Sequence, residues 1–299
     1  MLRSLPLRVA LHCAAAVVAA PSGEFHAVHY FVGANETSVP AHRPGDWHSQ
    51  STQDRLVGAL LGWKRGGFFV DLAANDPVDL SNTYSLEHDY GWHGVCIDGN
   101  VELLPALARH RACHVVGAVV STPTKVVSFR RFHGRYTGRG FVPHDSHIRS
   151  VKGHGLSGIV SFSADAPHRL KANHTFPEDS AAAPVDEVHT TVGLDTILRR
   201  IDAPRVVDYL SLDVEGAEMQ VLGNFPFDAP FSFRVLTIEE PKAPLKAVLR
   251  QHGFTPVLYL GTDELWIHEG HLEMTVAHAR DVLQAECARA HAYKCSSIL

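Results

Sequence analysis

Three apolar segments that each end in acidic residues constrain the fold of this chain more than any other feature. Two of them are Phe68-Phe69-Val70-Asp71, which follows a Gly-Gly pair, and Gly94-Val95-Cys96-Ile97-Asp98. The third is Val207-Asp208-Tyr209-Leu210-Ser211-Leu212-Asp213-Val214-Glu215. Short apolar runs of this kind, preceded by breakers, are typical of strands buried in a parallel sheet. Because the carboxyl ends of parallel strands meet at one edge, we predict a site there.

The turn after the first strand contains small residues that leave room for a ligand. Asp71 lies where the strand ends, and Ala73 and Ala74 allow a bound molecule to approach the backbone. Asp98 ends the second strand, where a carboxylate roughly 20 residues past the turn accepts hydrogen bonds from ribose hydroxyls. The alternative is that both acids are ordinary polar strand ends. The predicted cofactor-binding residues are Asp71, Ala73, Asn75, Asp98 and Asn100.

Strand and helix patterns alternate along the chain, which predicts a doubly wound α/β sheet with right-handed crossovers. Helical patterns cover 52–63, 82–90, 101–111, 217–222 and 245–252. Further strands are predicted over 113–120 and 233–239, and a strand that runs into a helix over 188–198. Two antiparallel strands, 254–260 and 264–268, are expected to close a mostly parallel sheet.

These motifs resemble the FkbM family of S-adenosylmethionine-dependent methyltransferases, and the resemblance covers residues 49–268. Its most specific part is Leu210-Ser211-Leu212-Asp213-Val214-Glu215-Gly216-Ala217-Glu218. The resemblance implies a Rossmann-like methyltransferase fold and S-adenosylmethionine as cofactor. It also implies O-methylation of a hydroxyl group on a sugar or other small-molecule or glycan acceptor. The other matching segments are Ser49-Gln50, Gln53-Asp54, Gly67-Phe68-Phe69-Val70-Asp71, Leu80-Ser81-Asn82-Thr83, Gly91-Trp92-His93-Gly94 and Asp263-Glu264-Leu265-Trp266-Ile267-His268.

The sequence departs from the family pattern near the predicted cofactor site. Ala73 and Pro77 stand where the family usually or often has glycine. Alanine disfavours positive φ, and proline fixes φ and removes an N–H group. Asp98-Gly99-Asn100 replaces a typical Glu-Pro-Asn, so the acid is kept but is one carbon shorter. These changes either tune cofactor affinity or mark a chain that no longer binds the cofactor.

Asp213 and Glu215 are the predicted catalytic residues, because they lie at the tip of the third strand. As i and i+2 positions of a strand they would share a face. Two close carboxylates raise one pKa and create a base, or together hold a divalent cation that lowers the pKa of the acceptor. The alternative is that Glu215 only caps the helix that starts near Ala217.

The charge composition of the chain bears on its partners. The net charge is −5 with no Lys/Arg-rich run, which argues against nucleic acid as a partner.

Residues 1–20 resemble a signal peptide, since Arg3 and Arg8 precede an apolar run too short to form a stable membrane span. We predict the secretory pathway or an extracellular location, and the alternative is an organelle reached by a transit peptide. Asn35 and Asn173 begin glycosylation sequons that fit secretion.

The predicted organisation has a leader and three further parts. An irregular N-terminal arm over 21–48 precedes the methyltransferase domain at 49–268, which has an insertion at about 134–184, and a helical extension over 269–299 follows. The insertion is predicted to be a lid over the acceptor side or a disordered segment. Cys287 and Cys295 are close enough in sequence to pair, while Cys96 and Cys113 lie on or beside neighbouring strands. We favour a buried, idle thiol for Cys96.

Three other functions compete with methyl transfer. The Asp213-Val214-Glu215 unit also resembles the metal motif of nucleotide-sugar glycosyltransferases, which makes a lumenal glycosyltransferase the main rival. A non-catalytic binding module on a methyltransferase scaffold is a second rival, motivated by Ala73 and Pro77. An NAD dehydrogenase is disfavoured, because no Gly-x-Gly-x-x-Gly motif follows the first strand.

Overall fold

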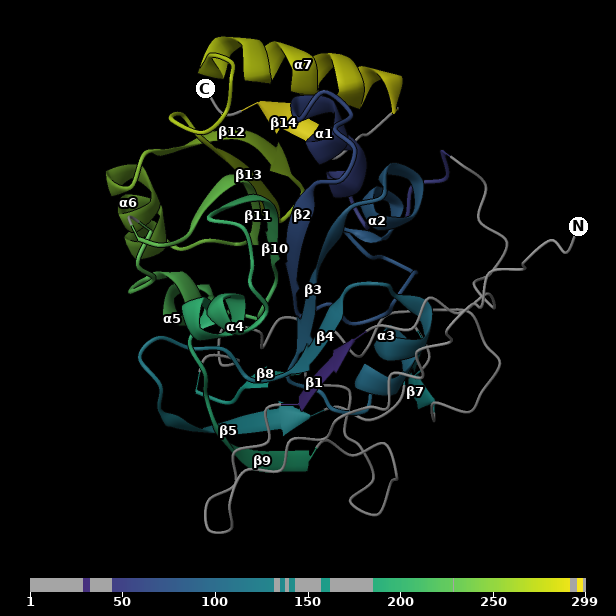
Figure 1. Cartoon of the computed structure of the whole chain (residues 1–299), viewed down its shortest axis with the longest axis vertical. Coiled ribbons are helices and arrows are strands. Elements are labelled where there is room, and N and C mark those ends of the chain that lie inside the picture. The colour runs from purple at the N-terminus through teal and green to yellow at the C-terminus, as the bar shows by residue number, and fades with distance from the viewer. Residues whose placement is uncertain are drawn as a thin grey trace, which may run out of the picture.

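The computed structural model describes residues 29–32, 45–131, 135–137, 140–142, 157–161, 185–227, 229–290 and 295–297. Their largest element is a nine-stranded sheet with the order β1-β4-β3-β2-β10-β11-β13-β12-β14 (Figure 1). Its five central strands are parallel, as their continuous apolar sequences predict. These are β2 (Phe68–Leu72), β3 (His93–Asp98), β4 (His114–Gly117), β10 (Val206–Leu212) and β11 (Ser232–Glu239).

Antiparallel strands complete both edges of the sheet. β13 (Asp263–His268) pairs with β11, and β12 (Phe254–Leu260) pairs with β13, which confirms the predicted closing strands. Beyond them, β14 (Cys295–Ser297) pairs with β12. At the opposite edge β1 (His29–Val32) pairs with β4. Neither β1, in the predicted irregular arm, nor β14, in the predicted helical extension, could be predicted from sequence, because both are short and their pairing partners are distant in the chain.

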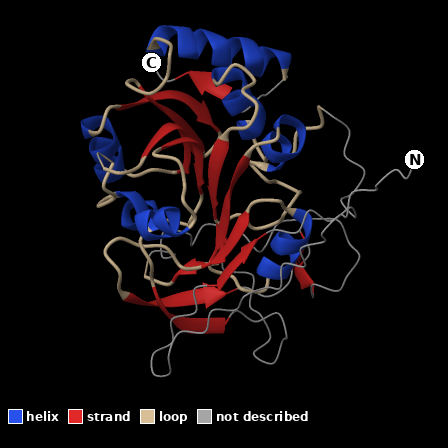
Figure 2. Cartoon of the chain, in the orientation of Figure 1, coloured by secondary structure: helices blue, strands red, loops and turns tan. Residues whose placement is uncertain are grey.

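Helices cover both faces of the sheet (Figure 2). One face packs against α1 (Gln53–Leu60), α2 (Tyr84–Tyr90), α3 (Leu104–His110) and α7 (Val276–Arg289). The other face packs against α4 (Leu194–Arg200), α5 (Glu218–Leu222) and α6 (Ala243–Gln251). Adjacent residues of a strand point to opposite faces, so Phe69 joins the first core and Val70 the second. The fold is therefore the doubly wound α/β arrangement that the sequence predicts.

A separate small sheet lies near the carboxyl ends of the central strands. It contains β8 (Gly158–Ile159), β5 (Val126–Arg131) and β9 (Val185–Thr190), in that order. A hairpin of β6 (Arg135–Thr137) and β7 (Gly140–Val142) follows β5. The predicted insertion at 134–184 therefore contains β6, β7 and β8, and the rest of it lies outside the described residues.

The cysteines follow the sequence expectations. Cys287 on α7 and Cys295 on β14 form a disulfide, whereas Cys96 and Cys113 are buried free thiols. The leader at 1–20 and the sequons at Asn35 and Asn173 lie outside the described residues. Among the residues that are described, no helix combines the length and apolar character needed to cross a membrane.

Candidate active site

The turn after β2 has an unusual backbone. Ala73 has a φ of 66° and Asn75 a φ of 52°, so two non-glycine residues adopt the left-handed conformation. The backbone N–H groups of Ala73 and Ala74 both donate to the carbonyl of Ile97 on β3, at 2.8 and 3.1 Å. The turn therefore keeps the positive φ that glycine allows, although Ala73 replaces the glycine usual in the family.

Asp98 ends β3 directly beside this turn. Its Oδ2 accepts the backbone N–H of Asn75 at 3.0 Å, and its Oδ1 accepts that of Asn100 at 2.7 Å. The residue is only 6% exposed, and this burial raises the pKa of its carboxyl group to about 6. Two of the predicted residues, Asn75 and Asn100, therefore fix the orientation of a third.

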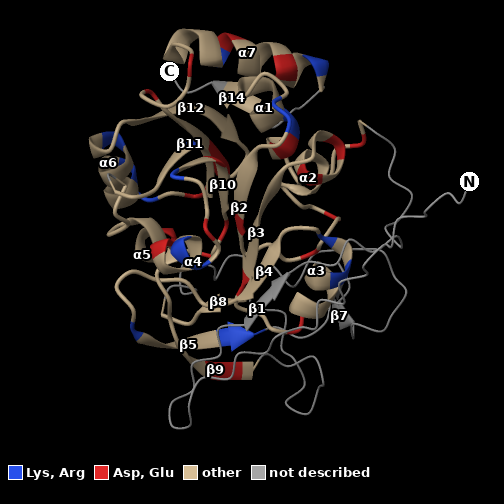
Figure 3. Cartoon of the chain, viewed as in Figure 1, with Lys and Arg blue, Asp and Glu red and all other residues tan. Residues whose placement is uncertain are grey.

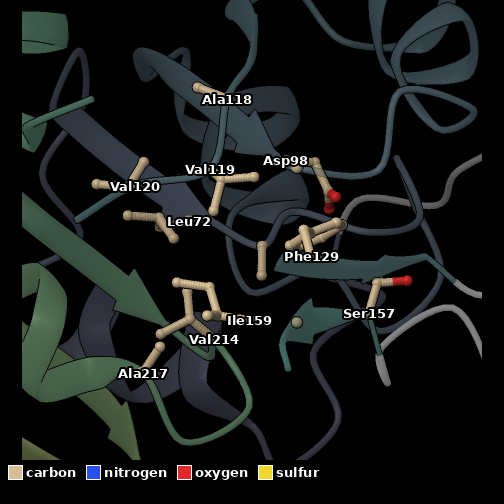
Figure 4. Close-up of a pocket in the computed structure, with 13 residues that line it drawn as sticks. Leu72, Asp98, Ala118, Val119, Val120, Phe129, Ser157, Ile159, Val214 and Ala217 are labelled. Carbon is tan, nitrogen blue, oxygen red and sulfur yellow. The ribbon is translucent and has the colours of Figure 1, made fainter. Parts of the chain in front are cut away.

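A pocket opens at the ends of β2, β3 and β4, under the small sheet (Figure 4). The space around its lining is about 400 Å³, which includes open solvent at the mouth. Asp98 is the charged residue of the lining, and neither Lys nor Arg lines it among the described residues. Of the predicted cofactor residues, Ala73 and Asp98 line the pocket. The full lining is Leu72, Ala73, Asp98, Gly99, Ala118, Val119, Val120, Phe129, Ser157, Gly158, Ile159, Val214 and Ala217.

Asp71 lies outside this lining, in a buried polar network. Its Oδ2 accepts a hydrogen bond from Thr83 Oγ1 at 2.6 Å, and Thr83 Oγ1 in turn accepts one from Arg111 at 2.8 Å. Arg111 is fully buried and forms an ion pair with Glu87 at 2.5 Å. Burial raises the pKa of Asp71, and the Arg111 charge opposes that rise. This position makes Asp71 a support for the turn rather than part of the pocket wall.

Three carboxylates converge next to the pocket. One oxygen each from Asp213, Glu215 and Glu239 lies within 4.8 Å of the other two. Val214, between the first two, lines the pocket. Burial, followed by the neighbouring Glu239 carboxylate, raises the pKa of Asp213 well above its usual value. Acidic residues are visible in the centre of the molecule beside β10 and β2 (Figure 3).

The reason given from sequence for the proximity of Asp213 and Glu215 was wrong. β10 ends at Leu212, so the two acids are not alternate positions of a strand. Instead Glu215 has a φ of 55°, and this left-handed residue turns the chain after the strand. Glu218, the first residue of α5, accepts the N–H groups of Val214 and Gly216 at 3.3 and 3.1 Å and so fixes the turn that precedes the helix. Burial raises the pKa of Glu218 to about 7.

Sequence reasoning missed three important residues. Glu239 is the last residue of the strand predicted over 233–239, but it was not assigned to the site, although β11 is the neighbour of β10. Arg111 gave no signal, because a single arginine at the end of a helix is usually exposed. Phe129 lies on β5, and the closure of the small sheet over the pocket could not be read from the periodicity of the sequence.

Together the strand order, the buried acid at the end of β3 and the adjoining pocket define a Rossmann-like methyltransferase. The chain belongs to the FkbM methyltransferase family, because the family model described as the methyltransferase FkbM domain matches residues 71–258. Comparison with curated proteins and with solved structures gave no significant match.

Proposed function

We propose that the protein is an S-adenosylmethionine-dependent O-methyltransferase that acts on a hydroxyl group of a sugar or another small molecule. The observation that carries the proposal is the pocket beside Asp98. It is mainly apolar and contains one carboxylate, which suits a nucleoside whose ribose hydroxyls donate hydrogen bonds. The cofactor supplies an electrophilic methyl group on a sulfonium sulfur.

The residues of the chain fit this cofactor in distinct ways. Asp98 would accept the ribose hydroxyls, since each of its oxygens has a lone pair left beyond its backbone hydrogen bond. Ala73 would lie against the cofactor, while Asn75 and Asn100 hold Asp98 through their N–H groups. Asp71 would support the turn from behind, through Thr83.

The carboxylate cluster supports the choice of an oxygen acceptor. Burial and the neighbouring Glu239 carboxylate raise the pKa of Asp213, and a carboxylate of this cluster can accept the proton that a hydroxyl loses on methylation. Three carboxylates also match the oxygen ligands that Mg²⁺ and Ca²⁺ prefer, so the same residues would hold a divalent cation. A bound cation would lower the pKa of the acceptor hydroxyl.

The rival functions have less support. A nucleotide sugar carries a diphosphate, which proteins usually bind with Lys, Arg or helix N-termini. Neither Lys nor Arg lines the pocket within the described ranges. The binding-module reading rested on Ala73 and Pro77, yet Ala73 keeps a φ of 66° and leaves the turn intact.

Calorimetric titration of the purified protein with S-adenosylmethionine tests the proposal. We expect saturable binding that Asp98→Ala abolishes and that Asp79→Ala, an exposed residue of the following loop, leaves unchanged. Transfer of labelled methyl groups to a panel of sugars would then identify the acceptor class. If the folded protein binds nucleotide sugars but not S-adenosylmethionine, the methyltransferase proposal is wrong and the glycosyltransferase function is favoured.

We further propose that the protein works in the secretory pathway or outside the cell. The Cys287–Cys295 disulfide supports this, because disulfides persist mainly in oxidising compartments. Non-reducing mass analysis of protein isolated from its native cells should find this disulfide and glycans at Asn35 and Asn173. Unmodified sequons together with a reduced pair, in protein recovered from an organelle, would favour the transit-peptide alternative.

A further inference from the structure

We propose that Phe129, on β5 of the small sheet, covers the nucleoside end of the cofactor and fixes its base by stacking. This inference rests on the proposed function, because it assumes that Asp98 holds the ribose. It assigns a binding role to the small sheet, which is inserted between β4 and α4 and lies outside the nine-stranded sheet.

The small sheet contacts the main domain through the wall of the pocket itself. Its buried side chains Phe129 and Ile159 form a separate hydrophobic cluster with Val119 and Ala217. All four residues of this cluster also line the pocket. A ligand in the pocket would therefore touch both the strand ends and the small sheet, and its binding would stabilise the contact between them.

The ring of Phe129 lies close to the proposed ribose carboxylate. A Cβ atom added at Gly99, the residue after Asp98, would be only 2.8 Å from Cζ of Phe129. Because Gly99 has no side chain, the ring of Phe129 can lie beside the end of β3. Figure 4 shows Phe129 next to Asp98.

The ring of Phe129 is held in place by a side chain of the neighbouring strand β9. His189 contacts it edge-on, with ring centroids 5.5 Å apart and an interplanar angle of 65°. His189 lies 3.2 Å from Glu187, which pairs with Arg131 at 2.6 Å. Arg131 also pairs with Glu102 of the main domain, so this network joins the small sheet to the segment that precedes α3.

The base of a nucleoside is attached directly to the ribose, so it must lie next to the group that holds the ribose. Asp98 and Phe129 are neighbours in the pocket, and a flat aromatic ring stacks on any base. The apolar side chains of Val119 and Ile159 extend the same wall. The geometry therefore assigns base recognition to Phe129.

Calorimetry with S-adenosylmethionine and with adenosine tests this assignment on the full chain. Phe129→Ala should weaken both ligands by the same factor, about 5- to 150-fold, the usual loss for one stacked base. Phe129→Leu keeps an apolar side chain, so its affinity for both ligands should fall by a smaller factor than that of Phe129→Ala. It replaces the alanine variant in this test if that variant folds poorly. The matched control is Val188→Thr, a 71% exposed position on the outer side of the same small sheet, which should bind like the wild type.

A double-mutant cycle separates stacking from a general structural effect. Gly99→Ala should displace the ring and weaken binding in the wild-type background, because its Cβ would meet Phe129. In the Phe129→Ala background the same change should cost much less, since the ring is gone. Equal losses in both backgrounds would contradict the assignment.

The outcomes distinguish this inference from the proposed function. Wild-type binding of S-adenosylmethionine with unchanged affinity in both Phe129 variants would overturn the role of Phe129 and leave the proposed function standing. A wild-type protein that is folded and binds neither ligand would overturn both.

Discussion

The backbone N–H of Asn75 donates to the Asp98 carboxylate over 3.0 Å, which ties the turn after β2 to the end of β3. The turn is also held by Ala73, whose N–H donates to the β3 residue Ile97. Any movement of the turn therefore moves the acid proposed to bind ribose. The relationship explains why the turn keeps its shape although it lacks the glycine usual in the family.

Cofactor binding should weaken in acid. Ionised Asp98 accepts ribose hydroxyls, and its pKa of about 6 means that it becomes protonated as the pH falls through 6. We expect the affinity for S-adenosylmethionine to be roughly tenfold lower at pH 5 than at pH 7, because one pH unit below the pKa is a factor of ten. Calorimetry over this range measures the effect. Asp98→Asn should bind S-adenosylmethionine more weakly, with an affinity that does not change between pH 5 and pH 7. If the affinity of this variant still falls in acid, another group is responsible for the pH dependence.

Replacing Ala73 with glycine should raise stability slightly. Ala73 has a φ of 66°, which costs an alanine about 1–2 kcal/mol. Glycine removes this strain, but it also makes the unfolded chain more flexible. The added flexibility lowers the free energy of unfolding by roughly 0.4–1 kcal/mol. The net gain in the free energy of unfolding should be about 0 to 1.6 kcal/mol by urea denaturation. Ala74→Gly is the control: Ala74 is buried without positive φ, so it should lose stability. Equal losses at both positions would show that Ala73 is not strained.

The sequence predicted the sheet well, and it predicted the site less completely. Buried parallel strands such as β2 and β10 are recognisable as continuous apolar runs, and their parallel direction follows from alternation with helices. The acid at a strand end, Asp98, was predicted by the same logic. Phe129 and Arg111 were not, because each gains its role from contacts with segments far away in the chain. Glu239 is an intermediate case. The sequence places it at the end of a predicted strand, but only the structure shows that this strand lies next to β10.

Arg111 should be essential for the stability of the region behind the turn. It is fully buried, pairs with Glu87 and donates to Thr83 and Ser81. Arg111→Met would leave a buried carboxylate without its partner, which typically costs about 3–5 kcal/mol. Arg111→Lys should rescue little, because an ammonium cannot reproduce the forked hydrogen bonds of a guanidinium. The exposed neighbour Arg109→Met should change the free energy of unfolding by less than about 0.5 kcal/mol. A similar small effect at Arg111 in chemical denaturation would refute this role.

Glu218 should make the protein less stable as the pH rises. Its carboxyl group has a pKa of about 7 in the folded state against 4.5 for the ordinary side chain. The folded state therefore binds the proton more tightly, and the extra stability present below pH 4.5 is lost as the pH rises through 7. The difference of about 2.5 pKa units corresponds to roughly 3 kcal/mol. Glu218→Gln, which keeps an acceptor for Gly216, should flatten this part of the profile in urea titrations. Glu240→Gln, at an exposed position, should not change it.

A divalent cation should raise the melting temperature if Asp213, Glu215 and Glu239 bind it. One oxygen of each carboxylate lies within 4.8 Å of the other two, and burial followed by repulsion from Glu239 raises the pKa of Asp213. A cation between the three carboxylates would remove that repulsion. A ligand at 100 times its dissociation constant stabilises a folded protein by about 2.7 kcal/mol, which is easily measured by thermal unfolding. Glu239→Gln should abolish the Mg²⁺- or Mn²⁺-dependent rise, while Glu240→Gln, a neighbouring exposed acid, should keep it. Stabilisation of the wild type without loss in Glu239→Gln would place the cation elsewhere. No stabilisation by either metal would leave the cluster as a proton acceptor alone, and methyl transfer should then resist EDTA.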